Sequence, residues 1–169
     1  MNERHIRTTE QIADLYDRIN ARWFDGQLTR PEIIMQGTSR IWCHYTLHDA
    51  FSGERAGKRI LRATRGSASS DLLELVEMLA HEMIHQFNNE IRNVQDTSSA
   101  GGRYHNRFFA EECKKHGLTA WKTNWNGYSR TVASQEMRDW IRASEENPTD
   151  HKRGQRKECQ QGRGAERSV

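Results

Sequence analysis

The order of apolar and polar residues predicts a helix, three short strands and two more helices within the first 117 residues of this 169-residue chain. From Thr9 to Phe24, apolar residues recur every three or four positions, which is the pattern of an amphipathic helix. Thr8 and Gln11 have the spacing of a capping box at its start. Asp25-Gly26 follows directly and is expected to end this helix.

Three short strands are expected after this helix. The first covers Glu32 to Gln36, and the second covers Arg40 to His48, where apolar and polar side chains alternate. The third covers Arg59 to Thr64, and Gly53 and Gly57 allow a turn before it. The last two strands are therefore candidates for a hairpin, although their spacing does not force this pairing.

Two further helices are expected on either side of a loop. The stronger helix runs from about Ser70 to Glu90. The stretch 93–103 is polar and contains glycines, so we expect it to form only loop. The next helix should begin near His105 and end at Gly117, a residue suited to a C-terminal cap.

The C-terminal part of the chain divides into an ordered and a disordered segment. Residues 118–148 contain three tryptophans and are expected to pack on the domain, with a helix from Gln135 to Ser144. Residues 149–169 hold almost no apolar side chain, so we expect them to form a disordered basic tail. The chain is thus divided into a domain of residues 1–130, a helical extension of 131–148 and this tail.

Charge and composition narrow the class of protein. The net charge is +3 at pH 7, and residues 151–169 hold six Lys or Arg against two Glu, so the basic character belongs to the tail. The three cysteines form no CxxC pair, which excludes a cysteine zinc ribbon and argues against a disulfide framework. The N-terminus lacks a signal-peptide core, and no apolar run approaches the roughly 20 residues of a transmembrane helix. We expect a cytoplasmic protein that does not enter membranes.

The segment His81-Glu82-Met83-Ile84-His85, within the stronger helix, is an HExxH motif. Histidines four residues apart lie about 40° apart around a helix axis, so both imidazoles can bind one Zn²⁺. Glu82 lies about 100° further round, where it is a poor ligand but can accept a proton from a water that the metal activates. Metal-dependent hydrolysis of an amide bond requires these residue types at this spacing.

The alternative interpretation is that two histidines lie in one helix by chance. The apolar face of this helix is expected around Leu75, Leu79 and Met83, and His81 and His85 lie on the opposite side. Histidines of an apolar core are not expected there, so the remaining alternative is a pair that faces solvent. A chance HExxH match in this chain has odds of roughly 3 in 100, and we favour the metal site.

Zinc needs a third protein ligand if its fourth position is kept for water. The residues after the motif lack the HxxGxxH continuation of metzincins, so the ligand must come from another element. His105 is the stronger candidate because imidazole suits zinc and the residue follows the glycine loop. Glu112, on the same expected helix face, is its rival, and spacing alone does not decide between them. His116 is expected to be a capping or surface residue, and His44 and His48 are expected to be strand residues.

Three segments of the chain resemble the SprT-like zinc metalloproteases, the family that includes the DNA–protein-crosslink protease Spartan. They are LYDRINARWFDGQLTRPEI, LLELVEMLAHEMIHQF and GGRYHNRFFAEECKKHGL, and the resemblance covers about residues 9–130. The paired glycines and the YHNRF string look most like short phage and prophage members. In those members a Gly-Trp or Gly-Tyr segment follows the helix, and here it corresponds to Asn126-Gly127-Tyr128.

The resemblance implies an α+β fold with a zincin-like minimal metalloprotease core. This core has an N-terminal helix, a small three-stranded sheet, the HExxH active-site helix and a second ligand-bearing helix. The resemblance also implies Zn²⁺ bound by His81, His85 and His105, with Glu82 as the catalytic residue. The expected function is zinc-dependent hydrolysis of peptide bonds in protein substrates, including DNA-associated or DNA-crosslinked proteins. The alternatives are a non-catalytic zinc-containing nucleic-acid-binding module and a zinc amide hydrolase that acts on a non-protein substrate.

Two features bear on contact with nucleic acid. The cysteine zinc ribbon that follows the protease core in several family members is absent, so DNA-dependent activation does not carry over. The basic tail allows weak, salt-sensitive and nonspecific contact with phosphates, or is simply a solvated segment. Trp121 and Trp125 have the chemistry to stack on bases, but we expect them to pack against the domain. The sequence makes no prediction of oligomeric state.

Overall fold

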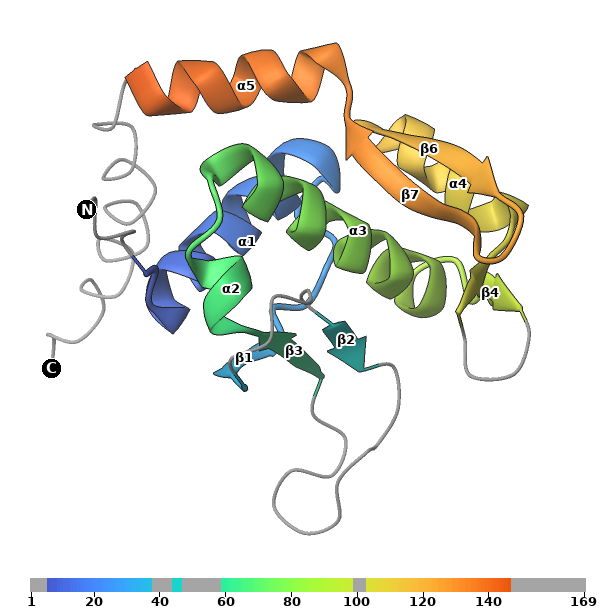
Figure 1. Cartoon of the computed structure of the whole chain (residues 1–169), viewed down its shortest axis with the longest axis horizontal. Coiled ribbons are helices and arrows are strands. Elements are labelled where there is room, and N and C mark those ends of the chain that lie inside the picture. Colours follow the sequence, from blue (N-terminus) through green and yellow to red (C-terminus); the bar gives the residue numbers. More distant parts are fainter. Residues whose placement is uncertain (1–5, 38–43, 47–58, 99–102, 147–169) are drawn as a thin grey trace, which may run out of the picture.

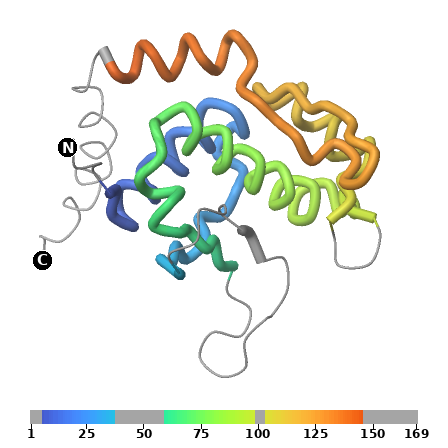
Figure 2. The backbone as a smooth tube through the Cα atoms, viewed as in Figure 1, coloured from blue at the N-terminus to red at the C-terminus, as the bar shows by residue number. Residues whose placement is uncertain are grey.

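The structure is a computed structural model that describes residues 6–37, 44–46, 59–98 and 103–146 (Figures 1 and 2). Within these residues, no helix combines the length and the apolar character needed to cross a membrane. Four expectations lie outside the described residues: the outer parts of the second strand, the turn at Gly53 and Gly57, the position of His48 and the tail 149–169.

The described part of the chain forms helices and strands in the mixed α+β class, as expected (Figure 1). The helices are α1 (Thr9–Trp23), α2 (Arg65–Ala68), α3 (Leu72–Glu90), α4 (Arg107–Lys115) and α5 (Gln135–Glu146). The strands are β1 (Glu32–Met35), β2 (His44–Thr46), β3 (Ile60–Ala63), β4 (Thr97–Ser98), β5 (Tyr104–His105), β6 (Leu118–Thr123) and β7 (Gly127–Ala133).

Two small sheets flank α3. In the first sheet β3 is central, and it pairs parallel with β1 and antiparallel with β2. The expected three-stranded sheet and the expected pairing of the second and third strands are therefore confirmed. The second sheet has the strand order β4-β5-β7-β6, with β6 and β7 as an antiparallel pair. Figure 1 shows α3 crossing the middle of the molecule, with the first sheet on one side and the β6–β7 hairpin on the other.

Local sequence signals set the ends of the two long helices. Thr8 caps α1 and exchanges hydrogen bonds with Gln11, so the expected capping box is confirmed. Asp25 follows α1 with a positive φ of 53°, which turns the chain out of the helix. Asp71 caps α3, because its side chain accepts a backbone N–H of the first helical turn at 2.7 Å.

One apolar core holds the elements together. The expected apolar face of α3 is confirmed, because Leu75, Leu79 and Met83 are all fully buried. A buried hydrogen bond also joins α1 to α3: the hydroxyl of Tyr16 donates to the side-chain oxygen of Gln86 at 2.6 Å. The other large, fully buried side chains are Phe24, Phe109, Ile12, Ile19, Ile60, Leu61, Ile84 and Leu118.

Three expectations about the second half of the chain are wrong or incomplete. Thr97 and Ser98 form β4, although the stretch 93–103 was expected to be loop only. His105 lies in β5 and does not begin a helix, because Asn106 caps α4 and the helix starts after it. The β6–β7 hairpin forms where only an ordered extension was expected, and β7 continues past residue 130. β4 with β5 and β6 with β7 pair as neighbouring strands, and β5 with β7 joins the two pairs, but the local polarity of these segments does not reveal any of this pairing.

Candidate metal centre

Helix α3 carries His81 and His85 one turn apart, on the side opposite its apolar face. His81 is half-buried and His85 is only 8% exposed. Helix α4 and strand β7 pack over this side of α3. The alternative of a histidine pair that faces solvent is therefore wrong.

Strand β5 brings His105 to the same place. His105 pairs antiparallel with Thr97 of β4 and parallel with Gly127 of β7, and its backbone N–H donates to the carbonyl of Asn126 at 3.0 Å. Gly127 has a φ of +61°, and a Cβ at this position would lie 2.1 Å from the carbonyl oxygen of His105. Only glycine permits so close an approach of β7 to the strand that carries the third histidine.

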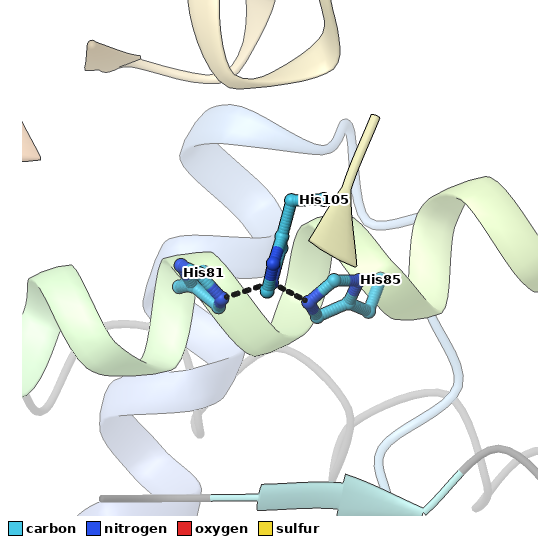
Figure 3. Close-up of side chains that lie close together, drawn as sticks. All are labelled: His81, His85 and His105. Carbon is cyan, nitrogen blue, oxygen red and sulfur yellow. Dashed lines mark hydrogen bonds between the residues drawn. The ribbon is translucent and has the colours of Figure 1, made fainter. Parts of the chain in front are cut away.

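The Nε2 atoms of the three histidines converge on one point (Figure 3). Nε2 of His105 lies 3.1 Å from Nε2 of His81 and 3.0 Å from Nε2 of His85. A tetrahedral zinc ion with Zn–N bonds of about 2.0–2.1 Å sets N–N separations of roughly 3.3–3.4 Å, so small adjustments would match these distances. Three histidines thus lie close enough together to bind one metal ion.

Each ring is held at its other nitrogen by an oxygen atom. The Nδ1 contacts are His81 with Thr131 Oγ1 at 3.1 Å, His85 with Asp96 Oδ2 at 2.8 Å and His105 with the Arg103 carbonyl at 3.2 Å. A carboxylate and a carbonyl only accept hydrogen bonds, so neutral His85 and His105 carry their proton on Nδ1. Their Nε2 lone pairs then face the common point, and this tautomer and orientation are what a metal site requires.

The ring of Phe109 in α4 forms an apolar floor under the three imidazoles. Its centroid lies 4.7 Å from that of His81 and 4.6 Å from those of His85 and His105. Phe109 is fully buried. It therefore limits the rotation of all three rings and keeps water away from one side of the point where the Nε2 atoms meet.

Burial and neighbouring charges move the pKa values of the three rings in different directions. Burial lowers the pKa of His81 well below its usual range, and the charges of the other two rings lower it further. Burial also lowers the pKa of His105 to about 4, again with a contribution from the charge of His85. Burial opposes the charged form of His85 as well, but the hydrogen bond and charge of Asp96, together with the charge of Glu82, outweigh burial and raise this pKa.

The directions of these pKa shifts indicate that a proton and a metal ion compete for the same position between the rings. Because its pKa is raised while those of His81 and His105 are lowered, His85 is the ring of the three that takes up a second proton most readily. That proton lies on Nε2 and can be donated to Nε2 of His105 across their 3.0 Å separation. Without it, the two Nε2 lone pairs would repel each other. A metal cation removes the repulsion in the same way, so it competes with this proton for the same position.

A cleft of about 610 Å³ runs along this side of α3 and reaches the histidines. Glu82 lines the cleft together with His81 and His105, and its charge acts on His85. The wall opposite α3 comes from β7 and includes Arg130 and Thr131. The cleft thus gives a ligand access to the histidines and to a carboxylate at the same time.

Glu112, the rival for the third ligand position, is not part of the histidine cluster. It is 1% exposed and contacts Arg92 at 2.8 Å, Lys115 at 2.7 Å and His116 at 3.2 Å. His116 is the C-cap of α4, as expected, but it is buried and its ring stacks on that of Phe24 at 4.3 Å. The buried carboxylate of Glu112 is therefore engaged in a separate ion-pair cluster.

Two tryptophans and a strand histidine were also assigned from the sequence. The expectation that Trp121 and Trp125 pack against the domain is wrong, because they are 46% and 89% exposed. Trp121 lies in the outermost strand of the second sheet and Trp125 in the turn of the β6–β7 hairpin, so neither side chain reaches the core. His44 lies in β2, which confirms its assignment to a strand.

Sequence reasoning missed the residues that hold the histidines in place, namely Asp96, Thr131 and Gly127. Gly127 lies in the segment Asn126-Gly127-Tyr128, which the sequence had singled out but without a role for the glycine. Asp96 lies in a polar stretch and Thr131 in a strand, and nothing local distinguishes either residue from its neighbours. Both are identified only by their contacts with histidines of α3.

Comparisons of the chain with protein-family models, with curated proteins and with solved structures found no match. Function is therefore inferred from the histidine cluster, the glutamate beside it and the cleft that opens onto both.

Proposed function

We propose that the chain is a zinc-dependent endopeptidase. The observation that carries the proposal is the convergence of three Nε2 atoms beside a glutamate in an open cleft. Three imidazole nitrogens suit Zn²⁺ and leave a fourth position for water or substrate. The proposal includes membership of the SprT-like metalloprotease family, as a short member of the phage and prophage type, and this part is supported only by the sequence segments that resemble that family.

Glu82 is the proposed general base and general acid. His81, His85 and His105 would hold the Zn²⁺, which would supply Lewis-acid activation of a water molecule and of the scissile carbonyl. Glu82 accepts the proton of the attacking water and passes it to the leaving amine, because its carboxylate lines the cleft beside His81 and His105. General acid–base catalysis contributes about 10²–10⁴-fold, so loss of this carboxylate should lower the rate by at least about 100-fold.

The shape of the cleft supports a peptide substrate. From Glu74 to Glu82 the cleft follows α3 for eight residues, which is about 12 Å of helix at about 1.5 Å per residue. An extended peptide advances about 3.3 Å per residue, so three or four residues fit along this wall. A peptide bond near the end marked by Glu82 would lie at the histidines.

The experiment compares the zinc-loaded chain with Glu82→Gln on casein, histone and peptidoglycan fragments. We expect cleavage of the proteins by the wild type, at least a 100-fold loss in Glu82→Gln, and unchanged zinc content, because the glutamate is not a ligand. Glu74→Gln is the matched control, since this exposed glutamate lines the same cleft on the same side of α3 but lies two helical turns before His81. Cleavage of peptidoglycan fragments alone would favour the non-protein amide hydrolase. Full activity in Glu82→Gln would contradict the proposed mechanism.

A second observation supports substrates that are associated with nucleic acid. The exposed ring of Trp121 shares a surface groove with Lys122 and Arg130, and residues 118–133 contain no acidic side chain. Exposed aromatic rings beside cations bind single-stranded nucleic acid through stacking and phosphate contacts. Arg130 lines both this groove and the catalytic cleft, so a strand bound there would lie next to the peptide substrate.

Fluorescence anisotropy of a labelled oligothymidine tests this second proposal. We expect salt-sensitive binding that weakens in Trp121→Ala and in Trp125→Ala, since stacking contributes about 1–3 kcal/mol per base. An absence of binding at low salt would contradict it. Binding combined with no hydrolysis of any protein would instead favour the non-catalytic nucleic-acid-binding module.

A further inference from the structure

Asp96 lies at the junction of the elements that carry the metal-site histidines. It follows α3 and directly precedes β4, and it is only 3% exposed. A buried carboxylate needs hydrogen-bond partners to offset its loss of hydration. The hydrogen bonds of Asp96 run to His85, to Asn88 and to Asn106, the residue after His105. The position of this residue therefore has a direct bearing on the geometry of the site.

The carboxylate of Asp96 fixes one histidine from behind. Its Oδ2 accepts from Nδ1 of His85 at 2.8 Å and from the side-chain amide of Asn88 at 3.0 Å. Asn88 lies one turn after the second histidine on α3, so the two donors hold the carboxylate oxygen in a single position. The imidazole of His85 is thereby fixed in the tautomer that leaves Nε2 free, and its plane is fixed as well.

The main chain at Asp96 fixes a second histidine. The carbonyl oxygen of Asp96 accepts the backbone N–H of Asn106 at 2.9 Å, and Asn106 directly follows His105. The next residue, Thr97, pairs with His105 across β4 and β5. The side-chain amide of Asn106 also donates to the carbonyl of Gln95 at 2.9 Å. The segment around Asp96 thus holds β5 in register while its carboxylate holds a ring on α3.

We propose that Asp96 is the positioning residue of the metal centre, with its carboxylate orienting His85 and its main chain setting the position of His105. Two ligands from distant parts of the chain are then aligned by one residue that does not touch the metal. The ring of His81 is instead hydrogen-bonded to Thr131, so Asp96 orients two of the three histidines and not the third. The proposal rests on the metal site of the proposed function but not on the hydrolysis of any substrate.

The test is zinc affinity, measured by competition with a chelator of known affinity at a temperature where every variant is folded. We expect Asp96→Asn to weaken zinc binding by about 10–100-fold, the range for loss of an outer-shell partner of a histidine ligand. The matched control is Asp71→Asn, which removes the same charge from the N-cap of α3 and should leave zinc affinity unchanged, since asparagine caps helices equally well.

Nitrogen NMR of the histidine rings in the zinc-free chain separates orientation from general destabilisation. At a pH where His85 is neutral, we expect the wild type to show one fixed state with the proton on Nδ1, and we expect an averaged signal from this ring in Asp96→Asn. The signal of His81 should not change, because its partner Thr131 is intact. A purely structural role for Asp96 would lower thermal stability and leave the ring state of His85 as it is.

Two results would overturn the proposal: zinc affinity of Asp96→Asn within about threefold of the wild type, or an unchanged His85 signal in that variant. A wild type that binds no zinc would overturn it together with the proposed function. A wild type that binds zinc more than about threefold more tightly than Asp96→Asn supports the role of Asp96, whether or not the chain cleaves peptides.

Discussion

The two sides of α3 are stabilised by different kinds of interaction. On one side, Leu75, Leu79 and Met83 are buried in the apolar core, where stability depends mainly on the area removed from water. On the other side, His81 and His85 pack on the ring of Phe109 and are held by directed contacts to oxygen atoms. Apolar cores tolerate changes of shape that keep volume, whereas hydrogen-bonded ligands lose their orientation when one contact is lost.

Because of this difference, the free energy of unfolding and the metal affinity should respond to changes on different sides of α3. Changes on the apolar side should lower the free energy of unfolding and leave the arrangement of the histidines intact. Changes on the side of the histidines should lower metal affinity by more than they lower stability. Phe109 is the exception, because it belongs to the core cluster and also contacts all three imidazole rings.

The largest expected effect comes from Phe109→Ala. Removal of a buried phenylalanine costs about 3–5 kcal/mol, and here the cavity would open directly beneath the three rings. We expect lower stability in chemical denaturation together with loss of high-affinity zinc binding. Leu79→Ala, on the opposite side of α3, is the control: it should cost about 2–5 kcal/mol but keep the zinc affinity of the folded chain. Equal loss of zinc affinity in both variants would contradict the separation of the two sides.

Gly127→Ala should have the next largest effect. Its Cβ would lie 2.1 Å from the carbonyl oxygen of His105, so β7 must move away from β5. Gly26→Ala is a matched control, because Gly26 has a similar positive φ of +69° and no atom within 4 Å of the added Cβ. We expect Gly26→Ala to cost about 1–2 kcal/mol from backbone strain, and Gly127→Ala to cost more and to weaken zinc binding as well. Thermal melting measures the loss of stability, and chelator competition measures zinc binding. Equal effects of the two substitutions would exclude a role for the close approach of β7 to β5.

The pH dependence of zinc binding should follow the separate pKa values of the three histidines. Zinc needs neutral rings, so a falling pH weakens binding wherever a ring gains a proton. The pKa of His85 is raised above the usual 6.5, whereas that of His105 is lowered to about 4 and that of His81 is also lowered. Between pH 6.5 and about 5, the apparent Kd should therefore rise about tenfold per pH unit, the slope for displacement of one proton. A rise of about a thousandfold in the apparent Kd per pH unit in this window would mean that all three rings titrate together.

The smallest expected effect on stability comes from the hairpin tip. Trp125→Ala removes a side chain that is almost fully exposed, and such surface substitutions usually change stability by less than about 0.5 kcal/mol. Trp140→Ala is the comparison, since this tryptophan of α5 is partly buried against the core cluster. Thermal melting should show a clear decrease for Trp140→Ala alone. A large decrease for Trp125→Ala would show that its ring packs on the protein after all.

The parts that could be predicted from the sequence are those set by contacts along the chain. The capping box at Thr8, the HExxH spacing and the apolar face around Leu79 depend on neighbours within one or two helical turns. The second sheet could not be predicted in this way. Strands β4 and β5 are only two residues each and depend on pairing, β4 with β5 and β5 with β7, whereas β7 pairs mainly with β6.

The same distinction applies to the site. His81, His85 and Glu82 follow from the motif, and His105 was chosen over Glu112 because imidazole suits zinc and because of a family resemblance. Its actual placement by two strands was not foreseen. The partners Asp96 and Thr131 lie 11 and 50 residues from the rings that they hold, beyond the reach of helical periodicity. A buried carboxylate behind a ligand becomes visible only once the chain is folded.

The most direct test of the metal centre is the zinc content of the purified, zinc-supplied chain by elemental analysis, alongside His105→Ala and Glu112→Gln. We expect about one zinc per chain in the wild type, little in His105→Ala and the full amount in Glu112→Gln, because a catalytic zinc site has only three protein ligands and is weakened strongly by the loss of one. A wild type that remains free of metal, or a His105→Ala variant that retains all of its zinc, would contradict a three-histidine site.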